Sequence, residues 1–283
     1  MSESTLLYKF RRFDEVRDID PDCQGYAASL LRDLLIYCAS PWDLNDPWEA
    51  RPAFLVPNYD IDSEHAKPYI NSLRRIQRPD QETAAEKWIR EVGWEAATRR
   101  MQVELHRSNS KFGIFSLAGN PIHELLWSYY GDGQRGYCWI VNREVEPFGS
   151  AAKVIYQSDR PELDWSRWDE LNHLKLSFLM KSDKWTHEDE YRVVLPPNAP
   201  AHLTVVPHNG NGPPLLGRYL KIPTDALIGV IFGGAMDPAR RGHIIRLARK
   251  YGRDIGFFET GIHGRKYEII IREVSAQEIA SLE

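Results

Sequence analysis

Cysteine is scarce in this chain of 283 residues, with only Cys23, Cys38 and Cys138. No two of them form a CxxC pair, so the sequence predicts neither a disulfide framework nor a four-cysteine zinc site. The chain also lacks a run of about 20 apolar residues, the length that spans a bilayer, and its start, MSESTLLYKFRRF, lacks the apolar core of a signal peptide. We therefore expect a cytoplasmic protein with no membrane partner.

Neither sign of charge is in large excess. The formal net charge is -4 and the pI is about 6.2, so the chain has no global attraction to nucleic acid, and binding to a polyanion would need a local basic groove. The hydrophobic fraction of 42% and the aromatic fraction of 11% are those of a protein with a packed core. The composition therefore argues against disorder.

Markers of several enzyme classes are missing. The chain has no GxxxxGK[ST] phosphate loop and no GxSxG nucleophile elbow. HELLW (123–127) begins like a zinc-protease helix, but Trp127 replaces the second histidine, so we expect no metal there. GDGQRG (131–136) matches GxGxxG, yet it follows a predicted helix and precedes a predicted strand, the reverse of the dinucleotide-binding order. A hairpin-like loop is the better interpretation.

Short runs of aromatic and β-branched residues alternate with helical patterns along the chain. We predict one α+β domain over residues 1–283, with a mostly antiparallel split sheet and a helical insertion at about 60–108. A further loop is expected at 207–217. The expected strands are residues 5–13, 34–40, 111–118, 136–143, 151–157, 190–195, 202–206, 218–222, 227–234, 255–260 and 266–274. The expected helices outside the insertion are 22–31, 120–131, 162–180 and 237–252.

The segment KSDKWTHEDEYRVVL (181–195) places charged side chains at the mouth of a strand. In an extended chain Glu188, Glu190 and Arg192 lie on the same side. One interpretation is a surface ladder of alternating charges, which contributes little stability. The other is a catalytic carboxylate, with a second glutamate that positions and an arginine that sets ionisation and direction. Residue types alone leave both open.

Three other segments supply polar and aromatic candidates. LNDPWE (44–49) holds Asn45, Asp46 and Glu49 around a proline, which predicts either an Asx turn or a rigid loop that lines a polar pocket. Ser116 stands late in a predicted strand. Trp127 and Tyr130 lie three apart on one helical face, where core packing is the default interpretation.

Six blocks in order, LYKFR, LNDPWE, FSL, LLWSYYGDGQRGYCWIV, KSDKWTHEDEYRVV and VIFGG, resemble the bacterial domain-of-unknown-function 2971 family. The resemblance runs from about residue 6 to 235, and the helices at 63–106 are its least similar part. LWSYY departs from the family pattern, because Tyr129 stands where the family usually has a histidine. The resemblance names relatives without naming a reaction.

A more distant resemblance is to mono-ADP-ribosyltransferases, which clamp NAD on a split antiparallel sheet. It implies that Lys9 or Arg11, which share a face of the first strand, holds the NAD ribose or phosphate. Ser116 would support the nicotinamide ribose, and Tyr129 or Tyr130 would stack on the nicotinamide. With Trp127 in the same segment, and with Asn45 and Asp46, these residues would form the walls of one polar pocket.

The same resemblance implies roles for the charged residues at the start of the strand expected at 190–195. Glu190 would bind the ribose 2′-hydroxyl and stabilise the oxocarbenium-like transition state, Glu188 would orient the acceptor, and Arg192 would steady the carboxylate. The implied function is ADP-ribosyl transfer or NAD hydrolysis, in a bacterial toxin or phage-defence system, with NAD as substrate. The acceptor, a protein, a nucleic acid or water, is left open.

Two alternatives belong to other classes. The first is a non-catalytic module that binds a nucleotide or a partner in stress or defence, and it would gain if Glu188 and Glu190 both faced solvent. The second is a metal-dependent nuclease, in which Asp46, Glu49 and the two glutamates would converge on a metal. The basic runs that such a nuclease would use alternate with acidic residues, which is typical of solvated helix faces.

Overall fold

The structure is a computed structural model that describes residues 5–15, 18, 25–76, 85–167, 170–199, 202–206 and 215–282. Its contacts divide the chain into two compact units. Unit 1 consists of residues 1–39, 113–154 and 186–283, and unit 2 of residues 40–112 and 155–185. The predicted helical insertion falls in unit 2.

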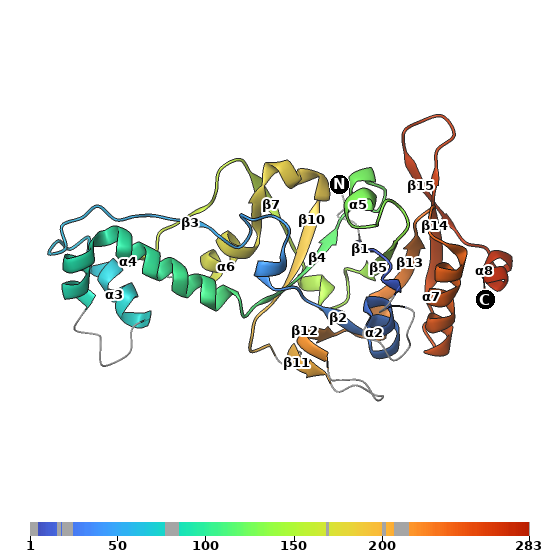
Figure 1. Ribbon diagram of the computed structural model, residues 1–283, viewed down its shortest axis with the longest axis horizontal. Helices are drawn as coiled ribbons and strands as arrows, with labels where there is room; N and C mark the ends of the chain where they lie inside the picture. Colours follow the sequence, from blue (N-terminus) through green and yellow to red (C-terminus); the bar gives the residue numbers. More distant parts are fainter. Residues whose placement is uncertain are drawn as a thin grey trace. The chain divides into compact units, whose positions relative to one another are not determined.

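Unit 1 is built on an eight-stranded mixed sheet (Figure 1). In spatial order its strands are β15 (Ile269–Glu273), β14 (Gly256–Ile262), β13 (Leu227–Phe232), β5 (Tyr137–Asn142), β1 (Leu6–Arg11), β4 (Gly113–Ala118), β10 (Glu190–Leu195) and β6 (Ala152–Lys153). Among the described strand pairs of this sheet, only β13–β14 is parallel. The predicted α+β class with a mostly antiparallel sheet is therefore confirmed.

The sheet forks between β1 and β4. β1 pairs with β5 along its whole length but with β4 only where Tyr8 faces Ala118. Further along, Ile114 of β4 bridges instead to Ala39, just after β2. A second sheet lies on that side, with β2 (Leu35–Tyr37), β12 (Leu215–Lys221) and β11 (His202–Val206) all antiparallel. The fork leaves room for side chains of β1 between the two strands.

Each face of the eight-stranded sheet packs against helices of unit 1. One face buries Leu117 and Trp139 together with apolar residues of α2 (Tyr26–Asp33) and α7 (Pro238–Lys250). The other face buries Phe10 and Cys138 under α5 (Glu124–Tyr129), which contributes Leu126 and Trp127. Because side chains alternate between the two faces along β1, neighbouring residues of this strand pack on the sides covered by different helices.

The parallel pair is joined by α7, which runs beside β13 and β14 (Figure 1). Asp237 caps the start of α7 by accepting a hydrogen bond from Ala239 N, and Pro238 occupies the first turn. Gly252, with φ of 63°, follows the end of the helix. These are the signals that predicted a helix over 237–252. The short α8 (Ala276–Leu282) packs on α7.

Unit 2 is mainly helical. Its helices are α3 (Lys67–Ile76), α4 (Ala85–Asn109) and α6 (Glu170–Phe178), with a 3-10 turn η1 (Pro41–Asp43). Its strands are β3 (Ala53–Phe54) with β8 (Glu162–Leu163), and β7 (Ile155–Gln157) with β9 (Met180–Ser182), both pairs parallel. Tyr69 and Trp165, 4.8 Å apart between ring centroids, form the centre of its core.

Several predicted boundaries were wrong. The helix expected over 162–180 begins at Glu170, because Glu162 and Leu163 form a strand. The strand expected over 151–157 is two strands, and β6 and β7 belong to different sheets. The helix expected to begin at 120 begins at Glu124, with His123 as its N-cap. The 131–136 segment is a loop between α5 and β5, and not a hairpin.

Two further predictions concern residues at the margin of the described chain. Residues 207–214 of the loop predicted at 207–217 lie outside the described residues, and β12 begins at Leu215. Of the helix predicted at 22–31, residues 26–31 belong to α2 and Gly25 is its N-cap, while residues 22–24 lie outside the described residues. None of the helices in the described ranges combines the length and apolar character that crossing a bilayer requires.

Candidate functional site

The centre of the candidate site is an ion pair at the start of β10. Arg192 Nε donates to Glu190 Oε1 at 2.7 Å, and Arg192 Nη2 donates to Glu190 Oε2 at 2.8 Å. The two side chains are 0% and 5% exposed. They share a face because they stand two apart on a strand, as the sequence predicts. The parallel pair of hydrogen bonds fixes the plane of the carboxylate.

Glu188 does not extend this ladder. It ends the 3-10 helix η4 (Asp183–Glu188), and Asp189 then turns the chain with φ of 41° before β10 begins. The prediction that Glu188 lies on the same side of one extended chain as Glu190 is therefore wrong. Glu188 is buried, and its Oε1 accepts a hydrogen bond of 2.6 Å from the Tyr130 hydroxyl.

The turn at Asp189 is held from both sides. The Asp189 carbonyl accepts a hydrogen bond from Gly119 N at 2.9 Å, and its carboxylate pairs with Lys153 Nζ at 2.8 Å. A Cβ on Gly119 would lie 2.1 Å from the Asp189 carboxylate. Because residue 119 is a glycine, the turn at Asp189 can pack directly against the residue that follows β4.

A group of rings lies beside the Glu188–Tyr130 pair. Tyr129, 60% exposed, has its ring centroid 6.2 Å from that of His187, which in turn lies 5.8 Å from His123. The sequence analysis missed both histidines as site residues. The available signals were that His187 directly precedes Glu188 and that His123 begins the rejected HELLW motif.

Lys9 lies in the fork of the sheet. Its Nζ donates to the Ser116 carbonyl at 2.7 Å and stands 4.9 Å from the centroid of the Phe115 ring. Burial of the amine away from water, together with the nearby Arg11 charge, lowers the pKa of Lys9 to about 7. The negative charges of Glu190 and Glu188 act in the opposite direction and raise it. The part of Ser116 that Lys9 contacts is its backbone.

Arg11 points to a set of tyrosines that the sequence analysis did not single out. Its guanidinium carbon lies 4.0 Å from the centroid of Tyr26, and Tyr37 and Tyr219 continue the row at centroid spacings of 6.2 and 5.4 Å. Burial raises the pKa of the neighbouring Cys38 to about 12, against the pull of Lys9 and Arg11. The thiol is therefore no candidate nucleophile.

Trp127 belongs to the core rather than to an open wall. Its side chain is fully buried, its ring stands edge-on to Phe10 at 5.1 Å, and its Nε1 donates to the Pro121 carbonyl at 2.8 Å. Tyr130 packs partly against the same cluster. The default interpretation of this helical face is thus confirmed for Trp127, while the hydroxyl of Tyr130 reaches Glu188.

Asn45 and Asp46 belong to unit 2. The Asp46 Oδ1 accepts a hydrogen bond from Trp48 N at 3.0 Å. This bond forms an Asx turn, one of the two structures that the sequence LNDPWE predicts. Asn45 is exposed. Glu49 forms a buried ion pair with Lys181, with Oε1 and Nζ 3.2 Å apart and exposures of 1% and 2%. These residues stabilise the local fold of unit 2.

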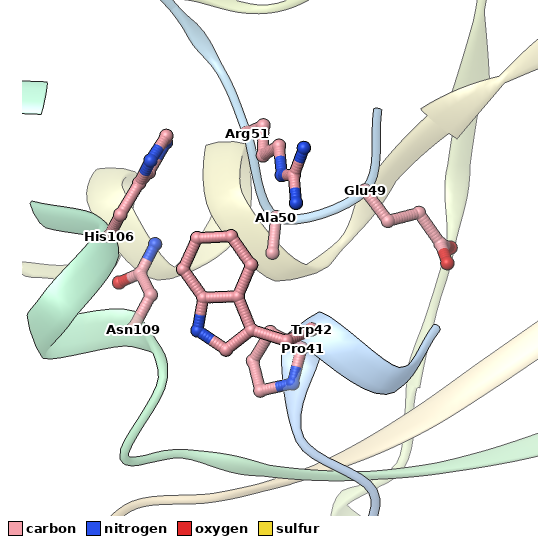
Figure 2. Close-up of a pocket in the computed structure, with 7 residues that line it drawn as sticks. All are labelled: Pro41, Trp42, Glu49, Ala50, Arg51, His106 and Asn109. Carbon is pink, nitrogen blue, oxygen red and sulfur yellow. The ribbon is translucent and has the colours of Figure 1, made fainter. Parts of the chain in front are cut away.

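A small cavity near this turn lies around Trp42 (Figure 2). The Arg51 guanidinium lies 4.8 Å from its ring centroid and His106 stands edge-on at 5.6 Å, while the Glu49 side chain extends away from it. The cavity volume of about 10 Å³ holds one water at most. Burial, with the charges of Arg51 and Arg160, lowers the pKa of His106. The cavity is too small for a nucleotide.

Among the described residues, no group of three or more His, Cys, Asp and Glu side chains is arranged to hold a metal ion. Comparison of the chain with models of known protein families, with curated proteins and with solved structures finds no match.

Proposed function

We propose that the protein cleaves NAD between nicotinamide and ribose, as an ADP-ribosyltransferase or NAD glycohydrolase. The observation that carries the proposal is the oriented Glu190 carboxylate at the mouth of β10, next to the Glu188–Tyr130 pair. The sheet fork with Lys9, and the order of β1, β4 and β10 as neighbours, support it. This arrangement agrees with the order of residues that the distant resemblance implies.

In this proposal the bond between ribose C1′ and the nicotinamide nitrogen breaks, and its electron pair leaves with nicotinamide. The ribose becomes an oxocarbenium ion, which a nearby carboxylate stabilises. Water or an acceptor group then attacks C1′ and loses a proton. The ribose 2′-hydroxyl would bind the Glu190 carboxylate, whose plane Arg192 fixes through both oxygens.

The other residues would bind rather than react. Tyr129, exposed and beside His187, offers a ring face to the nicotinamide. Lys9 and Arg11 offer positive charge to the phosphates, and an incoming phosphate would favour the charged form of Lys9. Glu188, held by Tyr130, would orient the acceptor.

A non-catalytic nucleotide-binding module is the second candidate. The exposure of Glu188 and Glu190 that would favour it is not found, because both are buried. The observation that favours it is the double hydrogen bond between Glu190 and Arg192, which suits a structural ion pair. In that case Tyr129, Lys9 and Arg11 would bind a nucleotide without cleaving it. NAD binding without nicotinamide release would support this candidate.

The test compares nicotinamide release from NAD by wild type, Glu190→Gln and Tyr129→Ala. Glu144→Gln is the matched control, because Glu144 is exposed on unit 1 and outside the site. We expect release by wild type and the control, a loss of about 100-fold or more in Glu190→Gln and weaker NAD binding in Tyr129→Ala. Far-ultraviolet circular dichroism checks that each variant is folded.

Cell lysate added to the reaction separates the two activities. Faster release with lysate indicates transfer to an acceptor, and equal rates indicate hydrolysis. Wild-type protein that neither releases nicotinamide nor binds NAD in calorimetry would overturn the proposal.

A further inference from the structure

A second, larger cavity lies on the α5 side of the sheet in unit 1. Its volume is about 640 Å³, within the range of about 300–1,000 Å³ that small-molecule sites occupy. It is lined by α5, by the 131–136 loop, by the turn after β13 and by β14. The proposed reaction at Glu190 uses none of its polar lining.

The floor of this cavity is fixed before any ligand arrives. The Thr260 hydroxyl accepts a hydrogen bond of 2.7 Å from Gly234 N and donates one of 3.0 Å to Gln134 Oε1. Arg241 donates to the Gly233 and Gly234 carbonyls at 3.0 and 3.1 Å, which clamps the turn after β13. The lining therefore needs little reorganisation on binding.

The lining carries charge of one sign. Of its ten residues only Glu124 is charged, and within the described part of the chain no ion pair involves its exposed carboxylate. Ser128 and Gln134 add neutral polar groups, while the exposed Ala235 and Ile262 add apolar surface. Ile262 is 80% exposed at the rim. An apolar wall with one carboxylate suits an aliphatic stem that ends in a cation.

We infer that this cavity binds an alkyl guanidinium or alkyl ammonium group, with Glu124 as its counter-ion and the exposed Ala235 and Ile262 against its stem. A phosphate or carboxylate ligand is disfavoured, because the lining offers it no cation. The group belongs either to a free small molecule or to an arginine or lysine side chain of a protein. The inference does not depend on NAD chemistry.

The test is a ligand-detected NMR titration of the full chain with pentylguanidinium and with pentylurea, its neutral isostere. We expect pentylguanidinium to bind at least about fivefold more tightly than pentylurea. Glu124→Gln should remove that preference, and Glu144→Gln should keep it. Ala235→Phe, which fills the cavity from its lining, should weaken both ligands.

A peptide with one central arginine, Gly-Arg-Gly with blocked ends, distinguishes the two sources. Binding at least as tight as that of pentylguanidinium assigns the cavity to a protein side chain, and weaker binding assigns it to a free cation. Equal binding of pentylguanidinium and pentylurea, or a preference that survives Glu124→Gln, overturns the inference. Since the readout is binding, a protein that lacks NAD cleavage can still show it.

Discussion

At the scale of single residues, the Glu190–Arg192 pair is a buried ion pair with a measurable energetic consequence. Both side chains are buried, and removal of Arg192 takes away the cation that binds both oxygens of the Glu190 carboxylate. We expect Arg192→Met to lower the free energy of unfolding by about 3–5 kcal/mol. Urea unfolding followed by circular dichroism measures it.

A double variant separates charge from packing in the same pair. Glu190→Met with Arg192→Met replaces both charges by apolar groups, so most of the lost stability should return. If Arg192→Met alone unfolds at the same urea concentration as wild type, the pair is not buried as described.

Lys9 gives a pH dependence of known sign. Its pKa falls from 10.5 to about 7 in the folded protein. Between these values the unfolded chain holds a proton that the folded chain lacks, so the free energy of unfolding rises with pH. The stability of wild type relative to Lys9→Met should therefore increase from about pH 7 to about pH 10. A difference that is constant over this range would contradict the lowered pKa.

Strand alternation predicted that Glu190 and Arg192 would face the same way, because that geometry is local. It failed for Glu188, since the left-handed turn at Asp189 depends on Gly119 and Lys153, which are distant in sequence. The proximity of His123 and Tyr129 to His187 depends on the same tertiary contacts.

At the scale of elements, the glycine after β13 shows why this part of the sheet tolerates little change. A Cβ at Gly233 would lie 2.1 Å from the Gln134 carbonyl oxygen, so the two loops would have to separate. We expect Gly233→Ala to lower the free energy of unfolding by about 1–3 kcal/mol. Thermal unfolding of the two proteins measures it.

Gly264→Ala is the control for added side-chain bulk. Beyond the glycine and its two chain neighbours, no heavy atom lies within 4 Å of a Cβ placed there, so the stability of the variant should stay within about 1 kcal/mol of wild type. Equal effects of the two substitutions would mean that crowding at Gly233 is not the cause.

Most strands were predictable because aromatic and β-branched runs define them locally, as β4, β5 and β13 show. The caps of α7 were equally readable. The break between β6 and β7 was not, because the pairing of β6 with β10 and of β7 with β9 is set by partners elsewhere in the chain. Short segments such as β8 carry too few residues for a periodic signal.

At the scale of the whole molecule, the α+β class followed from the mixture of patterns, whereas strand order did not. Neighbours such as β5 and β13 are far apart in sequence, and the fork between β1 and β4 arises from that order. The division into two units was equally hidden in the sequence, because unit 2 consists of two stretches that are separate in the chain. The prediction of a single domain and the family resemblances stay predictions.

The most direct test of the central claim is the rate of nicotinamide release from NAD by wild type and by folded Glu190→Gln at equal concentration. We expect release by wild type and a loss of about 100-fold or more in the variant. Equal rates in the two proteins, or no release by wild type, would contradict a catalytic role for Glu190.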